Sequence, residues 1–571
     1  TYSNYFGVAS PVKLFDLMNA EEFIMIANEK LANADRDPVA EVNSGRPKVD
    51  TDWQKAVLNT NAFQMDHNLA LSGSTEKLAY YFSLGYTSQQ GVAKPNEMER
   101  YTLRANVDQS VKKWLKVGAT IGATKSKYFG MNTGTNSLSG NIFNAIRQAP
   151  NTPYMDPDSE TGYNIDTENT NLVGRWNNGA TIDDNITNIM YIIDHNVYKS
   201  EITRLLANAY GLVTFTPWLN YKFGINVDQA LTDGFLFWNP RHGDGASYNG
   251  IVEQTQDKSF RWNIQNILNF NKEFGGNHNV GATLIAEYES TLQNGFWADG
   301  YDLSSEFFNQ NLISGTVGSM ECGGTMSDNG FISYAGRLNY NYAGKYFLQA
   351  SMRYDGISKL PMANKWGLFP GASIGWTISK ENFFTGLVDV VNDLKIRASY
   401  AKVGNTGIGN YPYLGLYGAA KYGDFNGIGY SQAGNSNLKW ETSVKYDVGT
   451  DIQFLDGRFG LTFDWYLNEI EDMILARPYP SSLGIPYNRI YENVGSMKNW
   501  GYEFSANAFI LRTKDLTWQI DFNLTLPHNN VTKLVEGSDI TYTYTIIREN
   551  EPIYSLFGYE YWGVNKANGF P

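Results

Sequence analysis

Apolar and polar residues alternate with a period of two along much of the chain, and this periodicity restricts the chain to β structure. Residues 78–87 show it first: Leu78, Tyr80 and Phe82 share one side of an extended chain, while Ser83 and Gly85 lie on the other. The pattern returns at residues 101–108, 115–122, 346–355, 461–468 and 518–526. By this criterion we count roughly seventeen strands, each with one apolar face.

The connections between these strands distinguish a barrel from a soluble sandwich. Short turns are found at residues 73–77, 110–113, 342–345, 456–457 and 512–515. Long links occupy about residues 130–196, 232–249, 298–329, 404–437 and 477–496. Short turns on one rim and long loops on the other are typical of outer-membrane barrels. We therefore predict an all-β fold, a transmembrane antiparallel β-barrel.

Composition agrees with this prediction. Aromatic residues make up 15% of the chain and charged residues only 18%. We find no run of about 18 apolar residues that would form a transmembrane helix, whereas a barrel strand needs only about 9–11 residues with every second side chain facing a polar lumen. Tryptophans near strand ends are expected to form interfacial girdles: Trp114, Trp218, Trp366, Trp440 and Trp518.

The alternation of short turns and long loops also predicts how the barrel is oriented in the membrane. If the short turns are periplasmic, the first strand, about residues 2–12, starts at the periplasmic rim. Residues 568–571 do not read as a strand. Because bacterial barrels close with an even number of strands, we expect closing strands beyond residue 571. Residues 1–6 lack the features of a signal peptide, so we interpret the chain as mature or as a fragment.

Charge and metal-ligand residues exclude several functions. The 58 acidic residues exceed the 45 basic ones, and the net charge of −13 without basic tracts argues against nucleic acid as a partner. The single cysteine, Cys322, excludes a disulfide framework or a cysteine metal cluster. The five histidines are scattered without an HExxH pairing, so we expect no metal site and no cofactor.

Three motifs that suggest chemistry are better explained as structure. Residues 371–375 match G-x-S-x-G, but Ser373 lies in a predicted strand rather than in a strand-to-helix turn. The glycines at 404–409 lack the Lys-Ser/Thr of a phosphate loop. Residues 155–162 resemble a calcium loop but contain Pro157 and lack the bidentate Glu, so we expect a solvated acidic loop. We predict no catalytic residue and no enzyme.

Aromatic residues in the long loops are the candidates for contact with a ligand, because aromatic rings are enriched in interfaces of every kind. The alternative is that they stabilise the loops against each other or against a partner protein. A helical pattern at residues 142–146 predicts that the first long loop is folded. The candidates are Trp176, Trp238, Trp297, Tyr411, Tyr413, Tyr417 and Tyr487.

A series of motifs resembles the SusC/RagA family of TonB-dependent outer-membrane transporters. They include LSGSTEK at 71–77, YYFSLGY at 80–86, RYDGIS at 353–358, WGLFP at 366–370, LKIRASY at 394–400, GNTGIGNY at 404–411, NLKWE at 437–441 and NVGSM at 493–497. The resemblance covers roughly residues 1–570 but only the barrel portion of the family, whose members have about 22 strands. We see no plug domain and no TonB box. We therefore expect residues 1–571 to form one barrel domain, incomplete at its C-terminal end and without a plug.

The resemblance implies active import across the bacterial outer membrane. A SusD-like surface lipoprotein caps the barrel as a hinged lid, and the TonB–ExbB–ExbD complex acts through the N-terminal part that we do not see here. The resemblance also allows a dimer of the transporter–lipoprotein pair. We expect oligosaccharide import. Oligopeptide import by the same mechanism, or a passive porin or adhesin barrel, are the alternatives.

Overall fold

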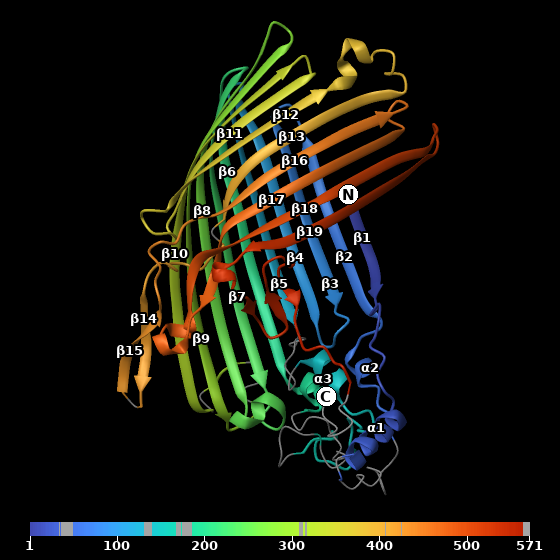
Figure 1. Ribbon diagram of the computed structural model, residues 1–571, viewed down its shortest axis with the longest axis vertical. Coiled ribbons are helices and arrows are strands. Elements are labelled where there is room, and N and C mark those ends of the chain that lie inside the picture. Colours follow the sequence, from blue (N-terminus) through green and yellow to red (C-terminus); the bar gives the residue numbers. More distant parts are fainter. Residues whose placement is uncertain are drawn as a thin grey trace.

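The computed structural model is dominated by one antiparallel sheet of 17 strands, which confirms the all-β prediction (Figure 1). The structure describes all residues except 34, 36–48, 131–139, 167–172, 174–185, 306, 308–311, 315–316, 406, 424 and 564–571, and the side chain of residue 536. Among the described residues, no helix is both long and apolar enough to cross a membrane.

The strands of the large sheet are β1 (Tyr2–Ala9), β2 (Ala62–Ser74), β3 (Leu78–Gln90), β4 (Glu97–Lys112), β5 (Leu115–Phe129), β6 (Val197–Thr216), β7 (Leu219–Trp238), β8 (Ile251–Phe274), β9 (His278–Leu303), β10 (Val317–Tyr342), β11 (Tyr346–Ile357), β12 (Trp366–Thr377), β13 (Val391–Asn405), β16 (Glu441–Phe454), β17 (Phe459–Pro478), β18 (Arg489–Arg512) and β19 (Thr517–Lys533). Smaller sheets are formed by β14 (Leu416–Tyr422) with β15 (Phe425–Gln432), and by β20 (Ile540–Thr541), β21 (Thr545–Ile547) and β22 (Ser555–Leu556).

The helices are α1 (Ala20–Asn33), α2 (Trp53–Val57), α3 (Asn141–Arg147) and α4 (Ile189–His195). The 3-10 turns are η1 (Gly243–Tyr248), η2 (Ile378–Lys380), η3 (Asn382–Phe384), η4 (Ser481–Leu483), η5 (Pro486–Asn488) and η6 (Val535–Gly537). The helix predicted at residues 142–146 is confirmed as α3.

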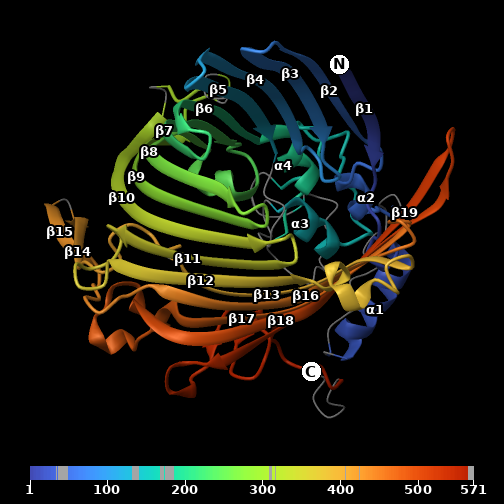
Figure 2. The same cartoon turned by 90° about the horizontal axis from the view of Figure 1, so that it is seen from above.

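The large sheet is a meander in which each strand pairs with the next one along the chain. The exception is β13, which pairs with β16 because β14 and β15 form a separate hairpin. Figure 2 shows the sheet curving around an interior, with α3 and α4 inside the curve and β14–β15 outside it. The fold therefore has an outer face, an inner face and two rims.

The two rims differ as the sequence predicted. Short turns follow β2, β4, β6, β8 and β10 on one rim, and the longest connections, residues 10–61, 130–196 and 406–440, lie on the other. Three predicted loops are too long, because β7 runs to Trp238, β9 runs to Leu303 while β10 starts at Val317, and β17 runs to Pro478. The start of β10 was missed because both of its faces are mostly polar or small, and the end of β7 was missed because Phe235 to Trp238 form a continuous apolar run; neither segment has the period-two signal.

The outer face carries an apolar belt. Side chains that alternate along the strands leave large apolar groups exposed, among them Leu84 at 56%, Leu338 at 62% and Ile374 at 59%. Aromatic pairs border the belt toward the long loops, as Tyr86 with Tyr101 and Tyr354 with Trp366 show. Exposed apolar belts edged by aromatic rings are the lipid-facing surface of an outer-membrane barrel. The chain accordingly lies in the bacterial outer membrane.

Two details of the sequence prediction need correction. Trp440 is not part of a girdle, because its ring is buried against Phe369 and Leu438 and its Nε1 donates to the Lys365 carbonyl. The first strand ends at Ala9 rather than near residue 12, since proline follows at position 11 and cannot donate to the ladder.

The helix α1 was not predicted, although the sequence contains its start signal. Asn19 Oδ1 accepts from the Glu22 N–H at 3.0 Å, and Glu22 Oε2 accepts from the Asn19 N–H at 3.0 Å. This reciprocal pair is a capping box, which an N-x-x-E motif before an amphipathic run indicates. The helix packs Phe23 and Ala27 against Ala149 of the next long loop.

Candidate functional site

Three connections on the long-loop rim pack into one folded unit, which we call the loop platform and define as α2, α3, α4 and η1 with the segments that join them to the barrel. Its core contains Trp53, Val57, Ile189 and Tyr191, each no more than 2% exposed. Trp53 Nε1 also donates to the Ala149 carbonyl at 3.2 Å. The described parts of residues 10–61 and 130–196 are therefore held together by burial as well as by hydrogen bonds.

A buried network of amide side chains attaches the platform to the barrel rim. Asn188 caps α4, and its Nδ2 donates to the Tyr154 carbonyl at 2.7 Å and the Asn164 carbonyl at 3.2 Å. The Asn188 backbone N–H donates to Nε2 of the buried His242 at 2.7 Å. His242 in turn donates its backbone N–H to Asn239 Oδ1. The chain of contacts links α4 to the end of β7.

Outside the platform core, a tyrosine hydroxyl forms a hydrogen bond with an aspartate carboxylate. The Tyr163 hydroxyl donates to Asp194 Oδ2 at 2.5 Å. Burial and this carboxylate raise the pKa of Tyr163 to about 12, because both disfavour the phenolate. The neutral phenol is thus the form that the folded platform requires.

The inner face of the sheet is polar. Across β6 to β8, Arg204 binds Asp228 in a bidentate pair, with Nε to Oδ1 at 2.8 Å and Nη2 to Oδ2 at 2.7 Å, and Arg261 Nη2 adds a contact at 2.9 Å. On β11, Arg353 Nε binds both oxygens of Asp355. The polar side chains that the period-two pattern placed opposite the apolar belt therefore line the lumen.

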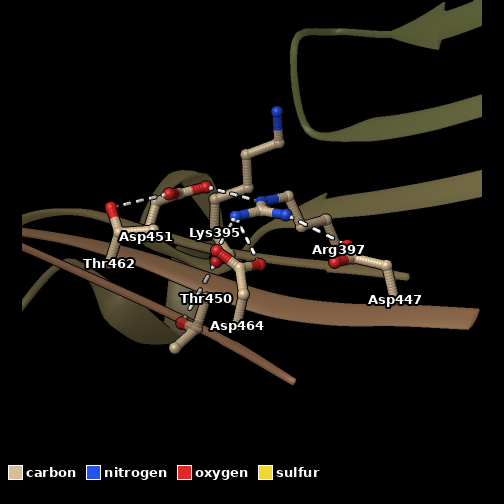
Figure 3. Close-up of polar contacts among 7 residues, drawn as sticks. All are labelled: Lys395, Arg397, Asp447, Thr450, Asp451, Thr462 and Asp464. Carbon is tan, nitrogen blue, oxygen red and sulfur yellow. Dashed lines mark hydrogen bonds and ion pairs between the residues drawn. The ribbon is translucent and has the colours of Figure 1, made fainter. Parts of the chain in front are cut away.

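On the opposite wall, one arginine holds three carboxylates (Figure 3). Arg397 on β13 donates to Asp464 Oδ2 at 2.7 Å, and to Asp447 and Asp451 at 3.2 Å each. Gly449 permits this approach, because a Cβ there would lie 2.8 Å from the Arg397 guanidinium carbon. Replacement of Arg397 would leave three carboxylates facing one another, so we regard it as the structural hub of this wall.

The hairpin arm, defined as β14, β15 and the adjacent η4–η5 loop, projects from the long-loop rim. Its apolar side chains face water: Tyr422 is 88% exposed, Ile428 81% and Phe425 77%. In the figures the arm lies outside the curve of the sheet, away from the loop platform (Figure 2). Exposed apolar patches are where proteins contact other proteins or membranes, so the hairpin arm is a candidate interaction surface.

The candidate aromatic residues are not gathered into one site. Tyr417 and Tyr487 lie on the hairpin arm, 71% and 78% exposed. Tyr411 donates its hydroxyl to Asp328 of β10, and Tyr413 packs against the cluster around Leu438. The partial burial of Tyr413 and the hydrogen bond of Tyr411 agree with a loop-stabilising role for these two residues.

Two further candidates line the inner face of the barrel. Trp238 ends β7 and donates Nε1 to the Tyr198 hydroxyl at 2.6 Å. Trp297 lies over Gly323, where a Cβ would approach its ring to 2.7 Å. Trp176 and residues 568–571 lie outside the described residues.

Two of the three motifs with apparent chemistry are placed by the structure. Ser373 lies within β12, as predicted, and no helix follows it directly. Asp156 is buried rather than solvated and accepts from the Asp158 N–H at 3.2 Å, so the expectation of a solvated loop is wrong for that residue. In the described part of the chain, no group of three His, Cys, Asp or Glu residues is arranged to hold a metal.

A large antiparallel meander with an apolar outer belt and a polar lumen defines an outer-membrane β-barrel protein. The profile of the family described as "TonB dependent receptor-like, beta-barrel" matches residues 135–569. The chain belongs to this family, whose members are transporters and receptors rather than enzymes.

Individual relatives agree with the family. The chain is 30% identical to TonB-dependent receptor P3 of Formosa agariphila, over 97% of this chain and 54% of that protein. It is 28% identical to TonB-dependent receptor SusC of Bacteroides thetaiotaomicron, over 95% of this chain and 53% of that protein. The chain thus spans about half the length of these curated relatives.

Among solved structures, the RagAB peptide transporter has the same fold. It superposes with a TM-score of 0.79 at 22% identity, over 99% of this chain and 65% of that chain. The resemblance to the SusC/RagA family is therefore confirmed.

Proposed function

We propose that this chain is the barrel domain of a TonB-dependent importer of oligosaccharides, working with a SusD-like surface lipoprotein and energised by the TonB–ExbB–ExbD complex. The observation that carries the proposal is the inner face of the sheet, where arginine, carboxylate and amide groups bind one another and form a polar wall. Such a wall suits a neutral ligand rich in hydroxyl groups.

The hairpin arm is the surface on which we propose that the lipoprotein docks. Its exposed aromatic side chains stand on the long-loop rim, which faces the cell exterior if the short turns are periplasmic. Partner interfaces are enriched in aromatic residues at their centres. We further propose that residues 1–571 act as one domain, because all 17 strands of the large sheet belong to one meander, and that the transporter–lipoprotein pair dimerises.

Oligopeptide import is the second candidate. The specific observation in its favour is the fold shared with RagAB, which is described as a peptide transporter. The mechanism and the partner are the same in both candidates. Only the ligand differs.

Purification of the full-length protein from solubilised outer membrane, followed by mass spectrometry, tests the partner. We expect a stoichiometric lipoprotein with the natural chain, and its loss from the double variant Tyr422→Ser, Phe425→Ser. The matched control is Phe383→Ser, a 71% exposed aromatic residue on the short-turn rim. A barrel that purifies alone would exclude the lid mechanism.

Uptake by cells tests the ligand. Cells that express the natural protein should accumulate labelled neutral oligosaccharides, and the accumulation should stop when TonB is deleted. Uptake of oligopeptides in place of oligosaccharides would favour the second candidate, and TonB-independent uptake of either would favour a passive pore.

A further inference from the structure

One connection on the short-turn rim is much longer than its neighbours. Residues 378–390 join β12 to β13, whereas the connections at 343–345 and 455–458 are short turns. The long segment, which we call the β12–β13 loop, folds as η2 and η3 followed by further hydrogen-bonded turns, and is the coiled yellow segment at the top of Figure 1. Because β12 and β13 are adjacent antiparallel strands, a tight turn would be enough to join them. The additional residues therefore need another explanation.

The β12–β13 loop folds back over the outer face of the barrel. Tyr346 on β11 and Trp376 on β12 lie opposite each other in the strand register and are 45% and 38% exposed. Both rings point outward, because Ile374, two positions before Trp376, belongs to the apolar belt. Glu381 of the loop accepts from the Tyr346 hydroxyl at 2.5 Å and from Trp376 Nε1 at 3.1 Å. Lys345 Nζ lies 3.3 Å from the same carboxylate and neutralises it.

These contacts place the loop at the level of the lipid headgroups. Tyr346 and Trp376 lie where the apolar belt meets the short-turn rim, which is the position of an interfacial girdle. The rings of such a girdle have their apolar bodies in lipid and their polar tips in the wet headgroup layer. Here the Glu381 carboxylate accepts from both polar tips. The loop therefore occupies a position on the outer face that headgroups and water would otherwise fill.

Apolar side chains of the loop are exposed beside this girdle. Phe383 packs edge-on against Trp376, with 6.5 Å between the ring centroids, and is still 71% exposed. Leu387 is 57% exposed and Val390 54%. Through Trp376, this surface is continuous with the lipid-facing belt of the strands. Apolar side chains of an interfacial segment enter the boundary between headgroups and acyl chains.

Lipid is the occupant that this position favours. The barrel wall separates the outer face from the lumen, so a domain inside the barrel does not reach Phe383. The two girdle rings beneath the loop face lipid themselves, and the loop adds apolar groups to the same surface. Short turns of outer-membrane barrels lie on the periplasmic side, so the lipid in question is that of the periplasmic leaflet.

We propose that the β12–β13 loop is an interfacial anchor, which inserts Phe383, Leu387 and Val390 into the phospholipid of the periplasmic leaflet. Glu381 holds the loop against the girdle, and the apolar side chains next to it contact the lipid. The inference does not depend on the cargo of the transporter, and it adds a lipid contact outside the barrel strands.

Depth-dependent fluorescence quenching tests the proposal. Phe383→Cys and Leu387→Cys are each labelled with the fluorophore NBD in the full-length protein, in a background free of other cysteines that includes Cys322→Ser. The protein is reconstituted into nanodiscs of phosphatidylethanolamine and phosphatidylglycerol. These nanodiscs contain lipids with a nitroxide either near the headgroup or near the end of the acyl chain. The matched control is Glu76→Cys, an exposed position in the short turn between β2 and β3 on the same rim.

We expect the nitroxide near the headgroup to quench the labels at 383 and 387 about twofold or more above the label at 76, because anchored side chains lie just below the headgroups. The same labels should be quenched less by the nitroxide at the end of the acyl chain. Leu387→Cys keeps the test valid if Phe383→Cys loosens the contact with Trp376.

Three results would overturn the anchor. Equal quenching at all three positions would mean that the loop stands in water like an ordinary turn. Blue-shifted emission at 383 and 387 without quenching by either nitroxide would mean that protein covers the loop instead of lipid. Stronger quenching by the nitroxide at the end of the acyl chain would mean that these side chains lie deep in the bilayer and not at its interface.

Discussion

The loop platform and the hairpin arm are both insertions on the long-loop rim, and both contain many aromatic residues, yet they treat these residues in opposite ways. Trp53 and Tyr191 of the platform are 2% and 1% exposed, whereas Tyr422 and Phe425 of the arm are 88% and 77% exposed. The aromatic side chains of the platform are buried within its own core. The aromatic side chains of the arm stay exposed to solvent.

The difference shows that aromatic content by itself does not identify a binding loop. A ring that is buried inside its own loop contributes to folding, and a ring that stays exposed after folding is available for a partner. Substitutions in the two regions should therefore separate stability from association, and the following four experiments test that separation in order of decreasing effect.

Trp53→Ala should have the largest effect. It removes a buried indole and its hydrogen bond to Ala149, and such truncations destabilise by about 3–5 kcal/mol. Hydrogen exchange of α3 and α4 should accelerate while the barrel strands stay protected. The matched control is Tyr422→Ala in the arm, and equal exchange in both variants would contradict the comparison.

Asn188→Ala should have the next largest effect. The substitution leaves the carbonyls of Tyr154 and Asn164 without their amide donor and removes the cap of α4, a loss of about 2–3 kcal/mol. The rate of proteolysis within residues 149–166, measured on intact membranes, reports this loss of stability. Asn382→Ala, an exposed amide in η3, serves as control, and cleavage at an unchanged rate in Asn188→Ala would show that the network is dispensable.

Alkaline pH should weaken the platform before the arm. The pKa of Tyr163 in the folded protein is raised to about 12. The stabilisation from the neutral Tyr163 phenol is therefore complete below pH 10 and is lost as the pH rises from about 10 toward 12. Tyr163→Phe has no proton to lose and should flatten this decline. Hydrogen exchange of α4 at pH 9 and pH 11, corrected for the intrinsic rate, measures it; an identical decline in the variant would exclude the Tyr163–Asp194 pair as its cause.

The double variant Tyr422→Ser, Phe425→Ser should have the smallest effect on stability. Because both rings are exposed, we expect the free energy of unfolding to change by no more than about 0.5 kcal/mol. Thermal unfolding of the purified barrel checks this. A fall as large as that of Trp53→Ala would mean that the arm also has a core, and the contrast between the two regions would disappear.

The sequence predicted the barrel strands well and the rim poorly, for a physical reason. A strand between lipid and a polar lumen must alternate, so residues such as Phe82 and Ser83 reveal both its existence and its inner face. Beyond the membrane that requirement ends. The polar start of β10 and the amphipathic α1 both lie there, and α1 was missed even though Asn19 and Glu22 encode its cap.

From the sequence, only the polar character of the inner face could be predicted, and not which of its residues contact one another. Period-two alternation places Asn226 and Asn263 on the inner face, but the register that aligns them across β7 and β8 comes from pairing between strands. Likewise, no local signal connects Arg397 with Asp464, which lies 67 positions further along the chain. Contacts between side chains of different strands depend on how the strands pair in the sheet, and single-strand patterns do not contain this information.

The length of β9 and β10 gives the barrel a raised wall. Tyr288 packs against Trp262 and belongs to the aromatic border of the belt. Past it, β9 continues to Leu303, and at about 3.3 Å per residue this extension is roughly 50 Å long. With a strand tilt of about 40°, its height above the lipid is close to 40 Å. On that side the wall of the barrel rises far above the lipid, so the long-loop ends of β9 and β10 lie well outside the membrane.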